Sequence, residues 1–570
     1  MSYKNLLDPW IILPTILFAL FVVPVIWIIS SLFGDYSDNW THIYNYTLSN
    51  YIYNTIFIII GTSIGTLIIG VGSAWLVTTY NFTGKNILEW ALLLPFAVPP
   101  YILAYTFTGL FDSYGTANNL IRDIFSLPHE FIFFPKLRNV YGAAIVFSFT
   151  LYPYVYLVSR MAFINQSRSI LEVGRTLGFS KFQVFYKLGI PSIRPAIIAG
   201  LMLVLMETIS DFGAVEHFSV NTFTTGIFSA WFGLYDFHTA KQLAALLLIV
   251  VITFLILEKY SRRKNRYSSG SNVFSPIAAE KLKGSKNIFA SLFCTIPVFI
   301  GFVLPNIQLA YWALNYKLDF FNEKFITTAW NTFYLAILTA IICAVLAIII
   351  NFSIRYRKNK ILNILSSFLT VGYAVPGLIL ALGVSQLLVF MDNLLFREYL
   401  DFVLTGSLVG LILAFVIKSF ALANSTIESG FLRINNRLDD VAKTLNTSGW
   451  KLLTQIHLPL LTTSFLTSMI LVVSEVIKEL PASLILRPFN YDTLAISTYI
   501  YAAEERMFDA AAPSIAIVGV GLLPIIILSR LIVKSRPGYR NNDNHYHLMY
   551  IFVYYKNSYS LIDLYDRKYS

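Results

Sequence analysis

Charged residues are scarce in this 570-residue chain: Asp, Glu, Lys and Arg make up 13% of it, against 56% hydrophobic residues and a mean hydropathy of +0.65. A soluble chain of this length does not need so much apolar surface, whereas apolar runs of about 20 residues match a helix that crosses the ~30 Å hydrocarbon layer of a membrane. The alternating segments of about ten residues that are typical of β-barrel strands are missing from the sequence. We therefore predict an all-α membrane protein.

The long apolar runs predict the spans of this protein. Lipid offers the backbone no hydrogen-bonding partner, so each run is interpreted as a helix. About twelve transmembrane helices, six in each half of the chain, are predicted at residues 10–32, 52–79, 88–111, 140–163, 193–213, 239–257, 288–311, 327–353, 361–390, 403–424, 460–478 and 512–534.

The chain also lacks the residue patterns of several enzyme and metal-protein classes. Its two cysteines, Cys294 and Cys343, both fall in apolar runs, which excludes a disulfide framework and a cysteine zinc site. No Gly-x4-Gly-Lys-Ser/Thr phosphate loop is present, so the chain cannot form its own ATP site. No Ser/His/Asp or metal-ligand cluster indicates catalysis. We expect a transport subunit that binds no cofactor itself, and we assign no metal site.

Lysine and arginine are missing from two predicted loops, 34–50 and 214–238, although the net charge of the chain is +11. They gather instead in segments 170–192, 258–287 and 354–360. Such alternation is the positive-inside pattern, which places the basic segments and both termini in the cytoplasm. The charge therefore orients the protein in a membrane and does not indicate nucleic-acid binding.

Two polar segments with the same spacing interrupt the apolar runs. The first island runs from Glu172 to Pro191 and the second island from Asp440 to Pro459, each over 19 positions. Residues on either side also match, so the chain is a parallel internal repeat, an architecture that places a pathway between its halves. The predicted organisation is a first half at 1–258 with its island within 170–192, a basic cytoplasmic linker at 259–287, a second half at 288–535 with its island within 438–460, and a tail at 536–570 without an assigned role.

Each island is predicted to form two short helices joined by a turn. Gly178 ends the first helix of the first island, since glycine adopts the left-handed backbone conformation without steric cost. Asn446, the next-best residue for positive φ, stands at the matching place in the second island. Pro191 and Pro459 are expected to end the second helix before the next span begins. An ordinary solvated loop would not keep this pattern twice, so we interpret the islands as docking elements for a repeated partner.

The islands resemble the EAA loops of ABC-importer permeases, which read Glu-Ala-Ala, three residues, Gly, nine residues and Ile-x-Leu-Pro, and the resemblance covers nearly all of 10–535. It implies a type I permease fold, two copies of a cytoplasmic ABC ATPase that uses ATP, and island helices that dock into those ATPases. Carried over by position, the docking residues would be Glu172, Gly178, Ile190, Pro191, Asp440, Asn446, Leu458 and Pro459. The chain departs from the pattern in having Val173-Gly174 for Ala-Ala, Asp440 for Glu and Asn446 for Gly, so the two docking sites are expected to be unequal.

Two further tracts narrow the resemblance. Ser210–Gly213 with Val220–Gly226, and Lys478–Ala482 with Leu486–Leu494, are similar to the fused two-half permeases of ferric iron importers. Such a permease lies in the bacterial inner membrane and receives iron from an extracytoplasmic binding protein. Importers of thiamine and phosphonate have related fused permeases, so another small solute stays open as the cargo.

Four acidic residues fall within or at the end of predicted spans: Glu207, Asp211, Glu475 and Glu479. Each pair is spaced i, i+4 and lies on one helix face. Ionisable side chains inside a span usually face a cavity or a partner. They would either line a cation pathway or hold the halves together, with Lys478 beside Glu479 as a ready ion pair. An ion-coupled secondary transporter is the rival class, but it would not need two matched cytoplasmic islands.

Overall fold

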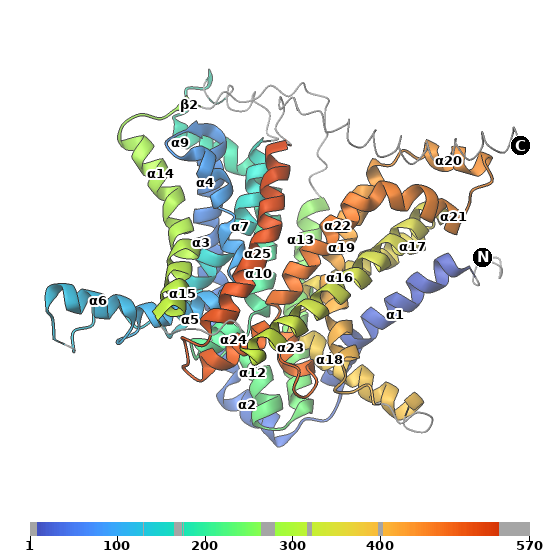
Figure 1. The fold of residues 1–570 in the computed structure, drawn as a ribbon, viewed down its shortest axis with the longest axis horizontal. Coiled ribbons are helices and arrows are strands. Elements are labelled where there is room, and N and C mark those ends of the chain that lie inside the picture. Colours follow the sequence, from blue (N-terminus) through green and yellow to red (C-terminus); the bar gives the residue numbers. More distant parts are fainter. Residues whose placement is uncertain are drawn as a thin grey trace, which may run out of the picture.

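The computed structural model describes residues 8–128, 130–164, 174, 176–263, 280–315, 322–396 and 403–534. Over these ranges the chain is a bundle of long helices, with one pair of two-residue strands, β1 (Tyr80–Asn81) parallel to β2 (Glu280–Lys281) (Figure 1). The all-α membrane class is confirmed. Most of the predicted linker and nearly all of the tail lie outside the described residues.

The helices follow the internal repeat. In the first half they are α1 (Pro9–Ser30), η2 (Ser31–Phe33), α2 (Asp38–Tyr46), α3 (Leu48–Thr79), α4 (Lys85–Ala91), η3 (Leu94–Ala97), α5 (Pro100–Phe111), α6 (Thr116–Phe125), α7 (Val140–Ile164), α9 (Lys181–Val184), η4 (Phe185–Gly189), α10 (Ile190–Ser210), α11 (Gly213–His217), α12 (Phe223–Phe228), η5 (Ser229–Gly233) and α13 (Phe237–Arg263). In the second half they are α14 (Ser285–Val298), η6 (Phe299–Val303), α15 (Leu304–Asn315), α16 (Glu323–Arg357), α17 (Lys360–Leu369), η7 (Thr370–Ala374), α18 (Gly377–Met391), η8 (Asp392–Phe396), α19 (Leu408–Arg433), α20 (Arg437–Thr444), α21 (Trp450–Leu452), η9 (Leu453–His457), α22 (Leu458–Lys478), α23 (Pro481–Leu486), α24 (Leu494–Ala503) and α25 (Ala511–Lys534).

Each of the twelve predicted spans falls mainly on helices, but two of them are broken. The span predicted at 361–390 is divided between α17 and α18, because the backbone of Val375 and Pro376 is extended between η7 and α18. Ten helices in the described ranges are long and apolar enough to cross a membrane. The span predicted at 88–111 is instead bent by 93° between Lys85–Ala97 and Pro100–Phe125. Two consecutive prolines, Pro99 and Pro100, cause this break, because neither has a backbone N–H to continue the helix. The span predicted at 512–534 lies on α25, whose apolar part in the described residues is the shorter stretch Ala511–Ile527.

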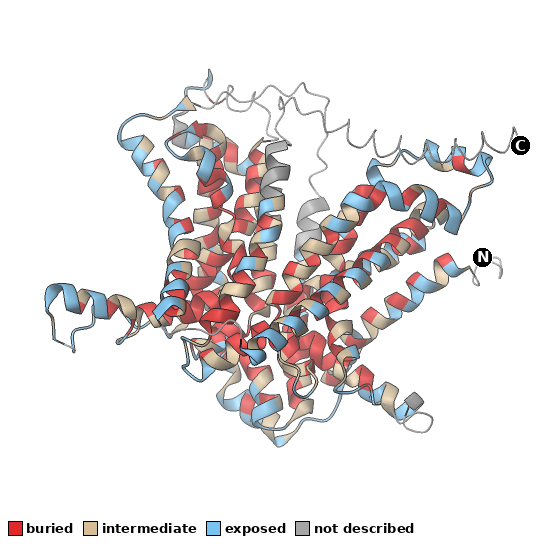
Figure 2. Ribbon diagram, in the orientation of Figure 1, coloured by how far each residue is buried: buried red, intermediate tan, exposed pale blue. Residues whose placement is uncertain are grey.

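The first helix of each half packs against the other half. α1 lies along α16, α17 and α18, and α14 and α15 lie along α3, α4 and α5 (Figure 1). Aromatic contacts accompany the exchange, for instance Phe21 against Phe420, with ring centroids 5.6 Å apart. Buried residues concentrate where the two sets of helices meet, and the outer faces of α3, α14 and α16 carry exposed apolar side chains, as expected of surfaces that contact lipid (Figure 2).

Small residues allow α3 and α7 to approach each other closely. Gly61 and Gly65 stand one turn apart on α3, where a Cβ at Gly61 would come within 2.9 Å of Ala144 Cβ and one at Gly65 would overlap the Ser148 side chain. Membrane helices commonly use such small-residue faces, because van der Waals packing takes the place of a hydrophobic driving force.

We expect Gly65→Val to destabilise the bundle, because the added side chain must push α3 and α7 apart. Overpacking of this kind costs about 1–3 kcal/mol. Gly519→Val, on α25, is the matched control, since nothing lies within 4 Å of a Cβ at that glycine. The measurement is the melting temperature of each purified variant in detergent. Equal melting temperatures for the two variants would contradict the assignment of close packing to Gly65.

Candidate functional site: a polar cavity between the halves

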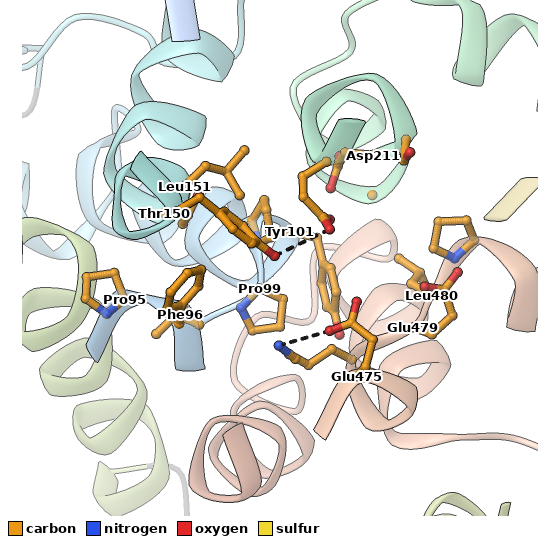
Figure 3. Close-up of a pocket in the computed structure, with 18 of the residues that line it drawn as sticks. Pro95, Phe96, Pro99, Tyr101, Thr150, Leu151, Asp211, Glu475, Glu479 and Leu480 are labelled. Carbon is orange, nitrogen blue, oxygen red and sulfur yellow. Dashed lines mark hydrogen bonds and ion pairs between the residues drawn. The ribbon is translucent and has the colours of Figure 1, made fainter. Parts of the chain in front are cut away.

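A cavity of about 90 Å³ lies where the two halves meet. It is lined by the broken segment η3–α5, by α7 and by the end of α10 from the first half, and by α19 and the end of α22 from the second. Figure 3 shows Pro95 and Phe96 on one side and the carboxyl groups of Asp211, Glu475 and Glu479 on the other. The structure thus brings all four acidic residues singled out from the sequence, Glu207 included, to one cavity.

Helix interruptions build this cavity. α10 ends at Ser210 and α22 ends at Lys478, and a short helix follows each, α11 and α23. Non-helical backbone at membrane depth is tolerated only where it is buried in protein or lines a cavity. The interruptions therefore place polar backbone and side chains in the interior and keep them away from lipid.

Two of the acidic side chains satisfy the backbone at these interruptions. The Asp211 carboxylate accepts a hydrogen bond from the Ala214 backbone N–H at 2.9 Å, at the start of α11. Glu479 accepts the equivalent bond from the Ala482 N–H at 3.3 Å, at the start of α23. Asp211 and Glu479 therefore have the same structural role in the two halves, which sequence periodicity alone did not show.

Glu207 connects the halves through a hydrogen bond. The Tyr373 hydroxyl, from the second half, donates to Glu207 Oε1 at 2.9 Å, and the Tyr154 hydroxyl donates to the same oxygen at 3.4 Å. Its repeat partner Glu475 instead lies 3.7 Å from the ammonium group of Lys478. The two matched carboxyl groups thus have different partners.

The prediction of an ion pair between Lys478 and Glu479 is wrong. Glu479 pairs with Lys418 of α19, and the side chains of both residues are at least 89% buried. Lys478 and Glu479 are neighbours at the end of a helix, so their side chains diverge, and Lys478 reaches Glu475 one turn back. Lys418 was not singled out from the sequence, although a lysine inside the predicted span 403–424 is itself a signal of a functional or paired site.

One more oxygen faces the cavity. Tyr101 lines it and is 5% exposed, and its hydroxyl has no hydrogen-bond partner among the residues described. Over the same residues, no group of three or more His, Cys, Asp or Glu side chains is placed to hold a metal ion. The cavity is therefore lined by oxygen ligands that are spread around it and not gathered at a single coordination centre.

The islands lie at the same end of the molecule, on opposite sides of the bundle (Figure 1). α9 of the first and α20 and α21 of the second are at the same end of the bundle in Figure 1, and Glu172 lies outside the described residues. The predicted turn is confirmed, because Gly178 and Asn446 both have positive φ, 71° and 58°. In both turns an N–H returns to a carbonyl five residues earlier, from Phe179 to Gly174 at 3.0 Å and from Thr447 to Ala442 at 2.9 Å, which is the helix-ending geometry of a Schellman motif.

The expectation that proline ends the second helix of each island is wrong. Pro191 and Pro459 lie in the first turn of α10 and α22, and each helix continues without a break from the island into the span. A π-helical turn precedes each proline, η4 in the first half and η9 in the second. The wider turn accommodates a residue that has no N–H to donate, so the island and the span form one continuous helix.

A buried polar network holds the second island against the bundle. Asp439 accepts a hydrogen bond from Arg355 Nε at 2.6 Å and lies 3.1 Å from His457 Nε2. Arg355, at the end of α16, also donates to the carbonyls of Phe431 and Ile434, each at 2.9 Å. Asp440, one residue on, stays 76% exposed beside Lys443. The second island therefore has a buried anchoring acid and an exposed acid next to each other.

We expect Lys418→Met to destabilise the protein strongly, since it leaves the Glu479 carboxyl group buried without its cation. Breaking a buried pair in this way costs about 3–5 kcal/mol. The double variant Lys418→Met with Glu479→Gln should recover much of the lost stability. Lys443→Met is the control, because its pair with Asp440 spans 3.9 Å on the surface and such pairs are worth about 1 kcal/mol or less. Melting temperatures in detergent check this, and an unchanged value for Lys418→Met would contradict it.

Comparison with known proteins gives a consistent result for both halves. A family model described as "Binding-protein-dependent transport system inner membrane component" matches residues 66–258 and again residues 336–538, together more than half of the chain. One match falls in each half, and together they include both islands and all four cavity acids.

Three relatives illustrate the range of similarity. The chain is 24% identical to the Fe(3+)-transport system permease protein FbpB 2 of Haemophilus influenzae, over 84% of this chain and 90% of that protein. It is 23% identical to the ferric transport system permease protein FbpB of Actinobacillus pleuropneumoniae, over 77% of this chain and 65% of that protein. The molybdenum transport system permease protein ModB of Escherichia coli is 28% identical over 35% of this chain and 87% of its own length.

These matches exclude the rival class, an ion-coupled secondary transporter. The family model matches each half separately, and the similarity to the Haemophilus influenzae relative extends over both halves. The structure accounts for the double match, with an island and a helix interruption at corresponding places in each half. This chain is a multi-pass permease of an ABC importer and belongs to the family of binding-protein-dependent transport system inner membrane components, with both halves fused in one polypeptide.

Proposed function

We propose that this permease imports ferric iron and that the iron passes between the halves through the cavity. The observation that carries the proposal is the charge of the lining: four carboxyl groups, Glu207, Asp211, Glu475 and Glu479, against the two amines of Lys418 and Lys478. Fe³⁺ is a hard cation that prefers oxygen ligands, and carboxylate and phenol oxygens predominate among the polar side chains here. The two FbpB relatives carry ferric transport in their names, which supports the same cargo.

The partners within the cavity make Glu207 and Glu475 the acids most available to cargo. Asp211 and Glu479 are held by helix-cap hydrogen bonds, and Glu479 also neutralises Lys418. Among the described residues, Glu207 accepts hydrogen bonds from tyrosine hydroxyls alone, and Glu475 has one ammonium partner, 3.7 Å away. An oxyanion such as molybdate would meet a surplus of negative charge. This argues against the cargo named for the half-length relative ModB.

The islands are proposed to dock two copies of a cytoplasmic ABC ATPase, one per half, and an extracytoplasmic binding protein would deliver iron at the opposite end. ATP would be bound and hydrolysed by the ATPase alone. The continuous helices from Phe185 to Ser210 and from Trp450 to Lys478 support this role. A helix that runs unbroken from the docking surface to the cavity can transmit a displacement from one to the other. The proposed orientation has the islands and both termini in the cytoplasm of a bacterial cell.

Glu207→Gln and Glu475→Gln test the pathway. Glutamine keeps the shape and the oxygen that accepts from Tyr373 but removes the charge. We expect ATP-dependent ⁵⁵Fe³⁺ uptake into proteoliposomes containing the ATPase to fall about tenfold in the double variant, which corresponds to about 1.4 kcal/mol on the barrier. Assembly and ATPase stimulation should stay unchanged. Loss of assembly would show that the acids only hold the halves together, and normal iron uptake would overturn the pathway.

Deletion of the chain tests the cargo separately. Cells that lack it should lose ferric uptake and keep their uptake of thiamine, phosphonate and molybdate. If ferric uptake persists in a strain without other iron importers while one of those solutes is no longer taken up, the iron assignment is wrong and the solute that is lost identifies the cargo.

Gly178 provides a test of docking by the first island. Gly178→Val forces a β-branched residue to adopt φ of 71°, which costs about 1–2 kcal/mol in this turn. No other atom lies within 4 Å of the new Cβ, so only the backbone is affected. Gly178→Asn is the matched control, because asparagine occupies this turn in the second island. We expect the valine variant to lose co-purifying ATPase and the asparagine variant to retain it. Full retention by both would argue against docking at this turn.

A further inference from the structure

The segment between α5 and α7 buries polar side chains and exposes apolar ones, which is the reverse of the usual arrangement in a soluble protein. It consists of α6 and the chain that returns from it to α7, and it projects sideways from the bundle, away from the end where the islands lie (Figure 1). In the sequence, the stretch 112–139 is nine residues longer than the matching stretch of the second half.

Polar side chains fill the interior of this hairpin. Asn118 and Arg122 are 1% and 4% exposed. Asn118 donates to the carbonyls of Phe111 and Asp112, both at 3.0 Å, and accepts from the Phe133 N–H at 3.1 Å. Arg122 donates to the carbonyl of Ser113 at 2.7 Å and to that of Phe131 at 3.4 Å. These bonds hold the returning chain against α6 and the end of α5.

Apolar side chains cover the exterior. The large exposed ones include Tyr114, Leu120, Ile124, Phe125, Ile132 and Phe133, of which Ile124 is 64% and Phe125 is 68% exposed. In water this arrangement would be unfavourable, because a hairpin would bury its apolar residues and expose its arginine and asparagine. The inverted arrangement is expected of an element that has an apolar environment outside it.

α6 also has a distinct polar face. At 100° per residue, Leu120 and Ile124 share one side of the helix, while Asn119 and Asp123 are exposed on the other. Asn118 and Arg122 form a third face, which is directed into the hairpin. A helix with one apolar and one polar exposed face is the form that lies in the plane of a membrane surface.

The neighbouring helix indicates what covers the apolar face. Thr116, at the start of α6, accepts a hydrogen bond from Gln308 Nε2 of α15 at 2.9 Å. α15 is part of the membrane span Ser285–Asn315, and its side chains Ile307 and Leu314 are 56% and 82% exposed. The apolar face of the hairpin therefore begins beside a surface that contacts lipid. It lies at the side of the bundle, whereas the cavity lies between the halves.

We propose that the hairpin formed by residues 114–128 and 130–133 is an interfacial membrane element, with Leu120 and Ile124 inserted among the lipid chains and Asn119 and Asp123 in the aqueous headgroup region. The apolar face of α6 contacts the phospholipid of the membrane in which the transporter lies. The element anchors the first half laterally, in the leaflet opposite the islands. This assignment does not depend on the identity of the cargo.

Spin labels test the proposal in the full chain. Cys294 and Cys343, both fully buried, are replaced by alanine. A nitroxide is then placed at Ile124→Cys or at the adjacent Asp123→Cys, and the protein is reconstituted in phosphatidylethanolamine and phosphatidylglycerol vesicles. Oxygen concentrates in the lipid, whereas a nickel chelate stays in water. We expect position 124 to collide severalfold more often with oxygen than with the chelate, and position 123 to show the reverse. Leu120→Cys and Asn119→Cys form a second matched pair in case the first pair does not assemble.

Two results would overturn the proposal. Equal access of the nickel chelate to positions 124 and 123 in vesicles would show that the apolar face lies in water. Protection of position 124 only after the binding protein is added would show that the face docks that protein and not lipid. Iron uptake is not measured in this experiment, so a failure of the ferric assignment would leave its outcome unchanged.

Discussion

The cavity between the halves depends on one constraint, which is that backbone polar groups inside a membrane must find partners within the protein. Prolines interrupt the helix before α5, and α10 and α22 stop at Ser210 and Lys478. Each interruption frees N–H and C=O groups that lipid cannot satisfy. The carboxylates of Asp211 and Glu479 satisfy some of them at the starts of α11 and α23. The helix interruptions, the acidic side chains and the cavity therefore occur at the same place. The acidic side chains satisfy backbone groups that the interruptions expose, and the cavity keeps the polar groups away from lipid.

The repeat conserves this backbone but not its charges. Lys418 and Lys478 of the second half occupy the places that Thr150 and Ser210 hold in the first. Tyr373 likewise stands where the first half has Phe96, and its hydroxyl crosses to Glu207. Both amines of the cavity thus come from one half. In the described lining of the cavity, the carboxyl groups of the first half have no amine from their own half, so a cargo cation would meet an asymmetric site within a nearly symmetric frame.

Local patterns in the sequence predicted the features that depend on local physics. Apolar length gave the spans, and the need for positive φ identified Gly178 and Asn446 as matched turns. Contacts between residues that lie far apart in the sequence could not be predicted from such local patterns. The contact of Lys418 with Glu479 joins residues 61 positions apart, and the exchange of α1 and α14 between halves depends on how whole helices pack. The role of Pro191 and Pro459 was misjudged because a single π-helical turn removes the conflict that makes proline a helix breaker.

The islands show how one repeat yields two unequal surfaces. In the first half the bulky ring of Trp75 packs over Gly189, where a Cβ would lie 3.1 Å from the indole. The matching pair in the second half is Phe352 and His457, with ring centroids 5.5 Å apart, so a smaller ring on the span accompanies a larger side chain on the island. The histidine at this place gives Asp439 a second polar neighbour besides Arg355. Among the described residues, the contact of the second island with α16 thus includes an ion pair and that of the first island with α3 includes aromatic packing, so the two docking surfaces rest on different contacts.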